Sequence, residues 1–314
     1  MYKISIIIVN YNGQKWLDKL FNSIRSQTYK QYEIIVIDNA STDHSVDLIE
    51  NYQEVQLYQC ENLGYGTAVN TASQYATGDF LLILNTDCYL KEDFLQKVID
   101  EYNNIPEKET FGTLGILTYD YDKKPIYQEM YGGKIDIMAV GCYAKKEKDI
   151  IFNGGSPLFI KKELYLKAGG FCPNIFLYNE DTDFGLRLTL YGYKHYFCDS
   201  TQIYHYVSGS TGDYSPKKLE WYLVGELNTI LNNFNVLLLI SLPVHFTFFI
   251  ALLIFYLLSG KIEFVKAILK GYQNVFTRLG QILSFRKIVQ NNRKISDIEI
   301  AKRMYYGLSR LLKY

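Results

Sequence analysis

The stretch "KISIIIVNYNG" (residues 3–13) decides the fold. Its first seven residues are almost continuously apolar, as expected of a strand covered on both faces, and a helical pattern then runs from Gln14 to about Ser26. The alternation continues with strand-like runs at 33–38, 55–59 and 79–85 and helical patterns near 43–51 and 66–76. Strands and helices that alternate in this way predict an α/β fold with a mostly parallel central sheet.

Polar residues follow each of these strands. The four clusters are Asn10 to Gly13, Asp38 to Ser41, Glu61 to Gly64, and Asn85 to Asp87. Asn, Asp and Gly are common in turns, so one such cluster by itself indicates little. In open α/β sheets, however, ligands bind beyond the carboxyl ends of the strands. Four clusters at four strand ends therefore predict one binding crevice.

The composition is that of a folded protein in a reducing compartment. The chain has 314 residues, of which 48% are hydrophobic and 16% aromatic, so it can form a packed core and is not disordered. Its five cysteines are scattered and include no CxxC pair, which argues against structural zinc. The opening "MYKISIIIVNYNG" becomes polar after nine residues, so we expect no export signal.

Two carboxylates at strand ends are candidates for ligand binding. Asp87 ends an apolar strand, where a divalent cation on a diphosphate would stabilise its charge, and oxygen ligands suit Mg²⁺ or Mn²⁺. Asp38 follows "EIIVI" and, if buried, needs a hydrogen-bond donor such as a base-ring N–H. For both residues, a plain turn at the end of a strand is the alternative.

A third acidic group lies in "FLYNEDTDFGLRL" (176–188), where Glu180, Asp181 and Asp183 fall within four residues at the start of a predicted helix. Helix chemistry alone accounts for acids in a first turn, with Asn179 as the N-cap. Catalysis is the other explanation, with one carboxylate as a base in a cleft. Successive helical residues point about 100° apart, so we expect Asp181 to stand away from Glu180 and Asp183, which share a face.

Six motifs together resemble family 2 glycosyltransferases in order and spacing. They are "SIIIVNYNG", "IIVIDNASTD", "NLGYGTAVN", "LLILNTD", "AGGFCPNIFLYNEDTDFGLRLTLYGY" and "IYHYVSGSTG". The sequence looks most like rhamnosyltransferase-like members that extend bacterial surface polysaccharides, and the resemblance covers nearly the whole chain. It implies a GT-A fold, a nucleotide-sugar donor, Mg²⁺ or Mn²⁺, and inversion at the anomeric carbon.

The resemblance also implies roles for single residues. Asn85-Thr86-Asp87 stands where the family has an Asp-x-Asp motif; the first acid is Asn here, so Asp87 is the expected metal ligand. Asp181 matches the catalytic base, and His205 matches a residue near the diphosphate or metal, although a lone His beside tyrosines also suits packing. The expected donor-binding residues are Val9, Tyr11, Asn12, Asp38, Asn62, Gly64, Asn85, Thr86 and Asp87. The expected acceptor contacts are Gly155, Tyr178 and Asp183.

These assignments lead to a mechanistic hypothesis. Asp181 removes the proton of an acceptor hydroxyl, while Glu180 and Asp183 orient the acceptor or cap the helix; general-base help of this kind is typically worth ~10²–10⁴-fold in rate. By resemblance the leading donor is dTDP-rhamnose, with UDP-hexoses as the alternative. The expected acceptor is a glycan or a glycan on a polyprenyl lipid.

The C-terminal third differs from the rest. Residues 236–258, "VLLLISLPVHFTFFIALLIFYLL", are almost wholly apolar, and from Lys261 onward twelve Lys/Arg stand against three Asp/Glu, although the whole chain has 33 of each. Such a tail suits an anionic partner, and the adjoining apolar segment favours a membrane surface over nucleic acid. We therefore divide the chain into a nucleotide-sugar-binding half (1–110), an acceptor-binding and catalytic half of the same GT-A domain (111–215) and a membrane-associating helical region (216–314).

Three topologies for the apolar segment stay open. Its 23 residues suffice to cross a hydrocarbon core of roughly 30 Å, but one crossing would place the basic tail on the far side from a cytosolic catalytic domain. Pro243 is also expected to divide the segment. We favour a peripheral, monotopic or re-entrant insertion on the cytoplasmic face of the cell membrane. A true span and a buried core or homo-oligomer helix are the alternatives.

Three other functions are compatible with parts of the sequence. A nucleotidyltransferase would normally carry a Gly- and Arg-rich phosphate loop after the first strand, where this chain reads "NYNGQKW". A dinucleotide oxidoreductase fits less well, because "NLGYGTA" lacks the third glycine and follows the third strand. An inactive membrane-bound carbohydrate-binding or scaffold relative is the third possibility, and the intact carboxylates argue against it.

Overall fold

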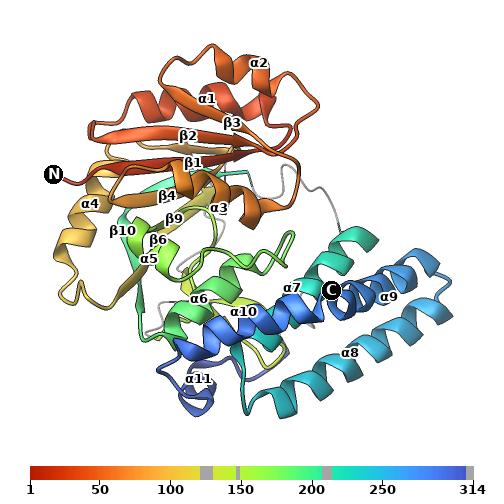
Figure 1. Cartoon of the computed structure of the whole chain (residues 1–314). Coiled ribbons are helices and arrows are strands. Elements are labelled where there is room, and N and C mark those ends of the chain that lie inside the picture. Colours follow the sequence, from red (N-terminus) through yellow and green to blue (C-terminus); the bar gives the residue numbers. More distant parts are fainter. Residues whose placement is uncertain (121–129, 146–148, 207–213, 309–314) are drawn as a thin grey trace.

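The computed structural model describes residues 1–120, 130–145, 149–206 and 214–308. An eight-stranded sheet in the order β3-β2-β1-β4-β9-β6-β10-β5 forms its centre (Figure 1). The four strands predicted from the sequence pair in parallel: β1 (Ile4–Asn10), β2 (Tyr32–Asp38), β3 (Val55–Gln59) and β4 (Phe80–Asn85). The predicted α/β alternation is therefore confirmed, and the carboxyl ends of these strands share one edge.

The second half of the sheet is mixed. Here β9 (Leu158–Lys161) runs antiparallel to both of its neighbours, β4 and β6 (Phe111–Asp120). Next, β10 (Lys194–His205) runs parallel to β6, and the short β5 (Cys88–Leu90) lies antiparallel to β10 at the edge. A separate hairpin consists of β7 (Met130–Ile135) and β8 (Gly141–Lys145).

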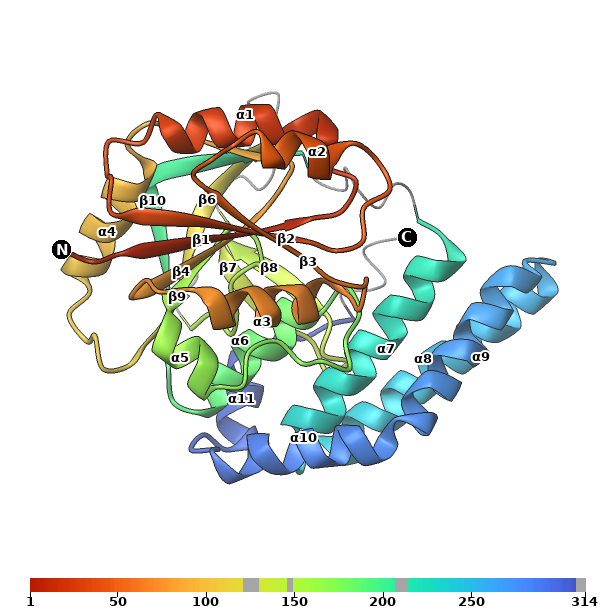
Figure 2. The same ribbon diagram turned by 45° about the horizontal axis from the view of Figure 1, so that its top comes forward.

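Helices cover both faces of the sheet (Figure 2). Alternate residues of β1 point to opposite faces: Ile4, Ile6 and Ile8 join one buried cluster, and Ile7 and Val9 join the other. The first cluster includes apolar side chains of α1 (Gln14–Arg25), α2 (Ser45–Glu50) and α4 (Phe94–Asn104). The second includes those of α3 (Tyr65–Tyr75), α5 (Lys162–Lys167) and α6 (Glu180–Leu190). Burial on both faces accounts for the almost continuous apolar run in β1.

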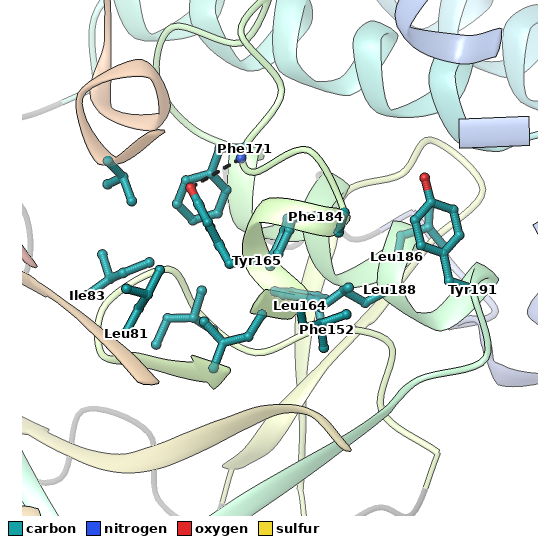
Figure 3. Packing of buried hydrophobic residues seen from close by; sticks show 14 of the residues in the cluster. Leu81, Ile83, Phe152, Leu164, Tyr165, Phe171, Phe184, Leu186, Leu188 and Tyr191 are labelled. Carbon is teal, nitrogen blue, oxygen red and sulfur yellow. Dashed lines mark hydrogen bonds between the residues drawn. The ribbon is translucent and has the colours of Figure 1, made fainter. Parts of the chain in front are cut away.

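Helix α6 is held by aromatic packing (Figure 3). Phe184 lies 5.2 Å from Tyr165 of α5 and 5.4 Å from Phe171, measured between ring centroids. Its apolar side chains Leu186 and Leu188 are fully buried in the same cluster. The first turn of α6, which carries the three predicted acids, is therefore fixed to the central domain.

In the described part of the chain beyond the sheet, five helices follow: α7 (Pro216–Asn233), α8 (Leu238–Leu258), α9 (Ile262–Thr277), α10 (Leu279–Asn291) and α11 (Asp297–Arg303). Helix α7 contacts α6 as well as α8, α9 and α10. In Figures 1 and 2, α8 and α9 extend side by side away from the sheet. Helix α7 thus connects the sheet domain to the C-terminal helices.

Helix α8 corrects one expectation. Pro243 does not divide the apolar segment, because it lies within one continuous 21-residue helix. Among the described residues, α8 is the one helix long and apolar enough to cross a membrane, which by itself is weak evidence of a span. Only 17% of its most apolar 18-residue window is buried. The alternative that α8 is a core helix buried within this chain is therefore wrong.

The inward side of α8 is partly polar. Ser241 and His245 are fully buried, and His245 Nε2 lies 3.5 Å from Oε2 of Glu226 on α7. Phe249 and Tyr256 continue the buried stripe, at helical spacing. These contacts orient α8 on the protein and leave its apolar remainder pointing outward.

Candidate active site

A cavity of about 620 Å³ lies at the carboxyl ends of β1 and β4. One part of its wall comes from residues at the ends of the parallel strands or shortly after them: Val9, Tyr11, Asn39, Asn62, Tyr65, Asn85, Thr86 and Asp87. Another part comes from residues later in the chain: Gly154, Gly155, Ser156, Pro157, Phe176, Leu177, Tyr178, Glu180, Asp181 and His205. The predicted crevice is confirmed, and both Asp87 and Asp181 open into it.

Strand pairing brings Asp87 and His205 together. Residue His205 at the end of β10 pairs with Cys88 of β5, directly after Asp87. As a result His205 Nε2 lies 3.0 Å from Asp87 Oδ1, and the amide of Asn85 lies 3.3 Å from the same ring nitrogen. Asp87 is only 4% exposed, so a cationic partner would stabilise the negative charge of its carboxylate.

This group fits a divalent cation. Among the described residues, the atoms offered by Asp87, Cys88 and His205 lie within 4.8 Å of one another. A carboxylate oxygen and an imidazole nitrogen suit Mn²⁺ well and Mg²⁺ through the oxygen. Burial raises the pKa of the Cys88 thiol well above its usual range, so the sulfur stays protonated and is a poor ligand for such an ion.

The backbone before α6 aims the two neighbouring acids. Tyr178 and Asn179 both have positive φ angles, 67° and 71°, which is unfavourable for residues with a Cβ. A Cβ on Gly225 of α7 would lie 2.6 Å from the Tyr178 carbonyl oxygen, so this glycine permits the close approach. Asn179 is the N-cap residue of α6, as expected, but its side chain donates to Ala139 O and Thr229 Oγ1 and makes no capping hydrogen bond to the helix.

Glu180 and Asp181 both border the cavity, which corrects the predicted separation of the two side chains. The cavity lies beyond the N-terminal end of α6, and side chains of a first helical turn lean toward that end. Two neighbours that diverge around the helix axis can therefore border the same space.

The two carboxyl groups have raised pKa values. Burial, together with the nearby charge of Asp181, raises the pKa of Glu180 to about 8. Burial also raises the pKa of Asp181, against hydrogen bonds from Thr182 and Gly155 that lower it. Oε2 of Glu180 is buried and has no hydrogen-bond partner among the described residues. A pKa of about 8 keeps the Glu180 carboxyl mostly protonated near neutral pH.

Asp183 is the clearest correction among the predicted site residues. It is fully buried, and its Oδ2 accepts a hydrogen bond from Arg187 Nη2 at 2.7 Å within an ion pair. Asn233 of α7 donates to its other oxygen at 2.8 Å. The expected acceptor contact is therefore wrong, because Asp183 is three residues beyond Glu180 on the side of α6 that packs on the protein.

Three expected donor contacts also lie outside the cavity wall. Asp38 is 2% exposed and already accepts hydrogen bonds from Asn10 and Ser41, and its neighbour Asn39 lines the cavity instead. Asn12 Oδ1 accepts from the backbone N–H of Thr42. Gly64, with φ 102°, allows close packing, since a Cβ there would lie 2.4 Å from Phe176 O. These three residues therefore support the residues that line the cavity and do not line it themselves.

Sequence reasoning missed the part of the wall formed around the start of α7. Ser215, Lys217, Lys218 and Trp221 line the cavity, and none of these four residues belongs to a recognised motif. The change of composition beyond Pro216 indicated a new region without indicating that its first turns return to the crevice. The second half of "IYHYVSGSTG", from Val207 onward, lies outside the described residues.

Comparisons with known proteins decide the family. The profile described as "Glycosyl transferase family 2" matches residues 5–178, more than half of the chain. The chain belongs to this family. It is a glycosyltransferase. The matched region includes the residues that line the cavity from Val9 to Tyr178.

Two curated relatives and one solved structure are informative. The chain is 25% identical over 302 residues to a dolichyl N-acetyl-α-D-glucosaminyl phosphate 3-β-D-2,3-diacetamido-2,3-dideoxy-β-D-glucuronosyltransferase of Methanococcus voltae, covering 89% of this chain and 92% of that one. It is also 25% identical over 241 residues to an N-acetylglucosaminyl-diphospho-decaprenol L-rhamnosyltransferase of Mycobacterium tuberculosis, covering 67% and 78%. The S. aureus TarS fragment 1–349 in complex with UDP-GlcNAc matches with a TM-score of 0.59 at 18% identity, over 97% of this chain and 93% of that one. The fold is thus GT-A, and the predicted rhamnosyltransferase-like resemblance is confirmed.

Proposed function

We propose that this glycosyltransferase moves a sugar, with rhamnose as the leading candidate, from a nucleotide-diphosphate donor to a hydroxyl of a lipid-linked glycan. The observation that carries the proposal is the opening of Asp87 and Asp181 into one cavity of about 620 Å³, large enough for a sugar between them. The names of two relatives, which specify a dolichyl phosphate and a decaprenyl diphosphate sugar, support an acceptor of this class.

The reaction that suits this geometry is a single displacement with inversion. Asp181 takes the proton from the acceptor hydroxyl, whose oxygen forms the new bond to the anomeric carbon. The bond from that carbon to the diphosphate oxygen breaks on the opposite face, and the nucleoside diphosphate leaves with the electron pair. Gly155 N–H and Thr182 hold the Asp181 carboxylate for this role at 3.1 and 2.7 Å. Protonated Glu180 donates a hydrogen bond within the acceptor site.

Asp87 and His205 are the residues that would hold Mg²⁺ or Mn²⁺. When bound, the ion supplies positive charge for the diphosphate leaving group. Tyr11, Asn39 and Asn62 lie after three neighbouring strands, where the base and ribose of the donor would bind, with Val9 beneath them.

We also propose that the protein works at the cytoplasmic face of the cell membrane, with α8 lying in the plane of the surface. The outward side of α8 is apolar: Leu239 is 78% exposed, Ile250 57% and Leu258 83%. A patch of this kind on a soluble surface indicates a partner, and a lipid bilayer provides an apolar one. Exposed basic residues that follow α8 in the chain suit anionic headgroups; they are Lys261, Lys266, Lys270, Arg278 and Lys287.

A panel of nucleotide sugars tests the proposal. A true donor raises the melting temperature of the purified protein, more strongly with Mn²⁺ present, and is then hydrolysed or transferred. dTDP-rhamnose is expected to act best, and a preference for a UDP-hexose would replace rhamnose as the sugar. A protein that neither binds nor turns over any nucleotide sugar would be a scaffold relative.

A further inference from the structure

Helix α7 presents a polar face to α6. Thr229, Asn232 and Asn233 are fully buried, and together with Gly225 they occupy positions i, i+4, i+7 and i+8 of the helix, which form one face. Buried hydroxyl and amide groups lower the stability of a protein unless they are hydrogen-bonded. A polar face of this kind therefore requires specific partners on the helix that it meets.

These partners lie in the first turn of α6. Oγ1 of Thr229 accepts a hydrogen bond from Asn179 Nδ2 at 2.9 Å, and Asn233 Nδ2 donates to Asp183 Oδ1 at 2.8 Å. The first backbone hydrogen bond of α6 joins Asp183 N–H to Asn179 O at 2.9 Å. Asp181 lies between these two residues, so α7 holds the turn that carries Asp181 at both of its ends.

The ion pair of Asp183 extends this network beyond α7. Arg187 is fully buried, and its Nη2 donates to Asp183 Oδ2 at 2.7 Å. Its Nη1 donates to the carbonyl oxygens of Ala168 and Gly170 at 2.7 and 2.8 Å. A buried ion pair often stabilises a protein no more than apolar residues of similar volume do. Stability alone therefore does not account for the charged pair, whereas a fixed orientation of α6 does.

Helix α7 is itself held by α10, and Figure 1 shows α10 running beside it. The side chains of Arg286 and Gln290, four residues apart on α10, donate to the carbonyl oxygens of Phe234 and Asn232 at 2.6 and 2.8 Å. Carbonyl groups at the C-terminal end of a helix lack partners within the helix, so these bonds fix that end of α7. Helix α7 is thus a rigid support for the first turn of α6.

A small rotation of α6 would move the Asp181 carboxylate appreciably. The Cα atoms of a helix lie about 2.3 Å from its axis and a carboxylate lies further out, so a rotation of roughly 15° displaces it by about 1 Å. A displacement of about 1 Å at a reacting group can reduce a rate about 100-fold. Gly155 N–H holds one oxygen of Asp181 directly, whereas α7 fixes the helix that carries the side chain.

We propose that Thr229 and Asn233 of α7 are positioning residues for the transfer reaction. They act through Asn179 and Asp183, whose contacts fix the rotation of α6 and thereby the direction of the Asp181 carboxylate toward the acceptor hydroxyl. This role rests on the proposed function, in which Asp181 is the base.

Substitutions on α7 test the two residues separately. Thr229→Val removes the oxygen that accepts from Asn179, and Asn233→Ala removes the donor to Asp183. Each variant should lower kcat about tenfold and leave KM for donor and acceptor unchanged. Asp183→Asn is unsuitable, because it leaves the Arg187 guanidinium buried without its carboxylate and destabilises the fold.

Two substitutions elsewhere are matched controls. The Thr71 hydroxyl on α3 donates to the carbonyl oxygen four residues earlier, as that of Thr229 does, so Thr71→Val removes the same kind of bond. Asn228 is 1% exposed and donates to Val224 O of its own helix, so Asn228→Ala truncates a buried amide of α7 itself. Both controls should keep the wild-type kcat. A fall in kcat for Asn228→Ala as large as that for Asn233→Ala would overturn the proposal.

A double-mutant cycle with Asp181→Asn identifies the residue through which α7 acts. The base is absent in the Asp181→Asn protein, so Thr229→Val and Asn233→Ala should leave its residual transfer unchanged. An equal tenfold loss with and without the base would show a general structural effect and would overturn the positioning role, even where the proposed function holds.

Stability at two pH values tests the network without transfer. Burial in the first turn of α6 raises the pKa of Glu180 to about 8, so Glu180→Gln is expected to stabilise the protein more at pH 8 than at pH 5. Asn233→Ala loosens this turn, so the same gain should be smaller in the Asn233→Ala protein. Equal gains in melting temperature in both proteins would contradict the network. A wild-type protein without transfer would defeat the proposed function, and this measurement would then decide whether α7 fixes the turn.

Discussion

The backbone N–H of Gly155 donates a hydrogen bond to Oδ2 of Asp181 over 3.1 Å. The next residue, Ser156, accepts one from the backbone N–H of Asn85 at 2.8 Å. One short loop therefore ties the carboxylate at the start of α6 to the end of β4, two residues before Asp87. The spacing between the two acidic ends of the cavity depends on this loop.

Replacement of Gly155 by Ala is expected to reduce turnover without unfolding the protein. The added Cβ would lie 3.3 Å from the Cβ of Asp181, so the carboxylate has to shift by a few tenths of an ångström. Because small displacements of catalytic groups are costly, we expect kcat to fall about tenfold with the donor KM unchanged. Gly280→Ala on α10 is the control, since nothing lies within 4 Å of its new methyl group. Equal kinetics for both variants would show that the loop does not position Asp181.

Asp181→Asn is expected to abolish transfer and preserve donor binding. The amide cannot accept the proton of the hydroxyl, so the rate should fall by ~10²–10⁴-fold. The affinity for the donor, measured by calorimetry with Mn²⁺, should be unchanged, which separates loss of the base from loss of the fold. Transfer within a few-fold of wild type would disprove the assignment.

Glu180→Gln tests the protonation of the buried pair through stability. Burial raises the pKa of Glu180 to about 8, so the folded state keeps the proton that the unfolded state releases above its ordinary value near 4.5. The folded state binds more protons between these values, and its stability therefore falls as pH rises from about 4.5 to 8. Glutamine has no proton to lose, so the variant should gain on the order of 3 kcal/mol relative to wild type over this window.

Melting temperatures at pH 5 and pH 8 measure that difference. Glu50→Gln, which neutralises an exposed carboxylate on α2, is the matched control. A constant difference between the Glu180→Gln variant and the wild type at the two pH values would show that Glu180 is ionised in the folded protein.

His205→Ala is expected to weaken binding of the cation. Its Nε2 lies 3.0 Å from Asp87 Oδ1, so its loss removes one of the two neighbouring groups proposed to hold the cation. The variant should need more Mn²⁺ for half-maximal activity than the wild type and should recover activity at high Mn²⁺. His44→Ala, at an exposed histidine before α2, should behave as wild type. Full activity of the wild-type enzyme in EDTA would show that the cation is not required.

The sequence predicted the parallel half of the fold because each strand there is short, apolar and followed by a helix. Asn62 and Asp87 could be placed at one crevice from strand ends alone, since parallel strands end at the same edge of a sheet. The antiparallel insertion of β9 between β4 and β6 has no such local signal. It depends on contacts between residues far apart in the chain, which a sequence pattern does not report.

Helical periodicity was least reliable at the start of α6. It correctly places Asp183 and Asp181 on different sides of the helix, but it wrongly groups Glu180 with Asp183. Periodicity contains no information about the cavity that lies beyond the end of the helix. The backbone of Tyr178 and Asn179, made possible by Gly225 of α7, sets that direction. Lys218 and Trp221 were missed for the same reason, since the return of α7 to the cavity is a tertiary effect.

Charges placed on the outward side of α8 are expected to release the protein from membranes. Ile250 and Ile254 are 57% and 50% exposed and point away from the buried stripe that contains His245 and Phe249. The double change Ile250→Glu/Ile254→Glu removes two apolar contacts, each worth roughly 1.5–3 kcal/mol when fully buried in lipid, and adds negative charge near anionic headgroups. Co-sedimentation with phosphatidylglycerol vesicles should therefore be lost.

Controls distinguish a lipid surface from a second protein copy on the same helix face. Leu166→Glu adds a charge at an exposed leucine of α5 and should leave vesicle binding intact. Binding of the wild-type protein should weaken with salt and on uncharged vesicles, because the lysines that follow α8 contribute about 1 kcal/mol each only near anionic lipid. A wild-type dimer in solution that the double variant converts to monomers, without any vesicle binding by the wild type, would assign the face to self-association instead.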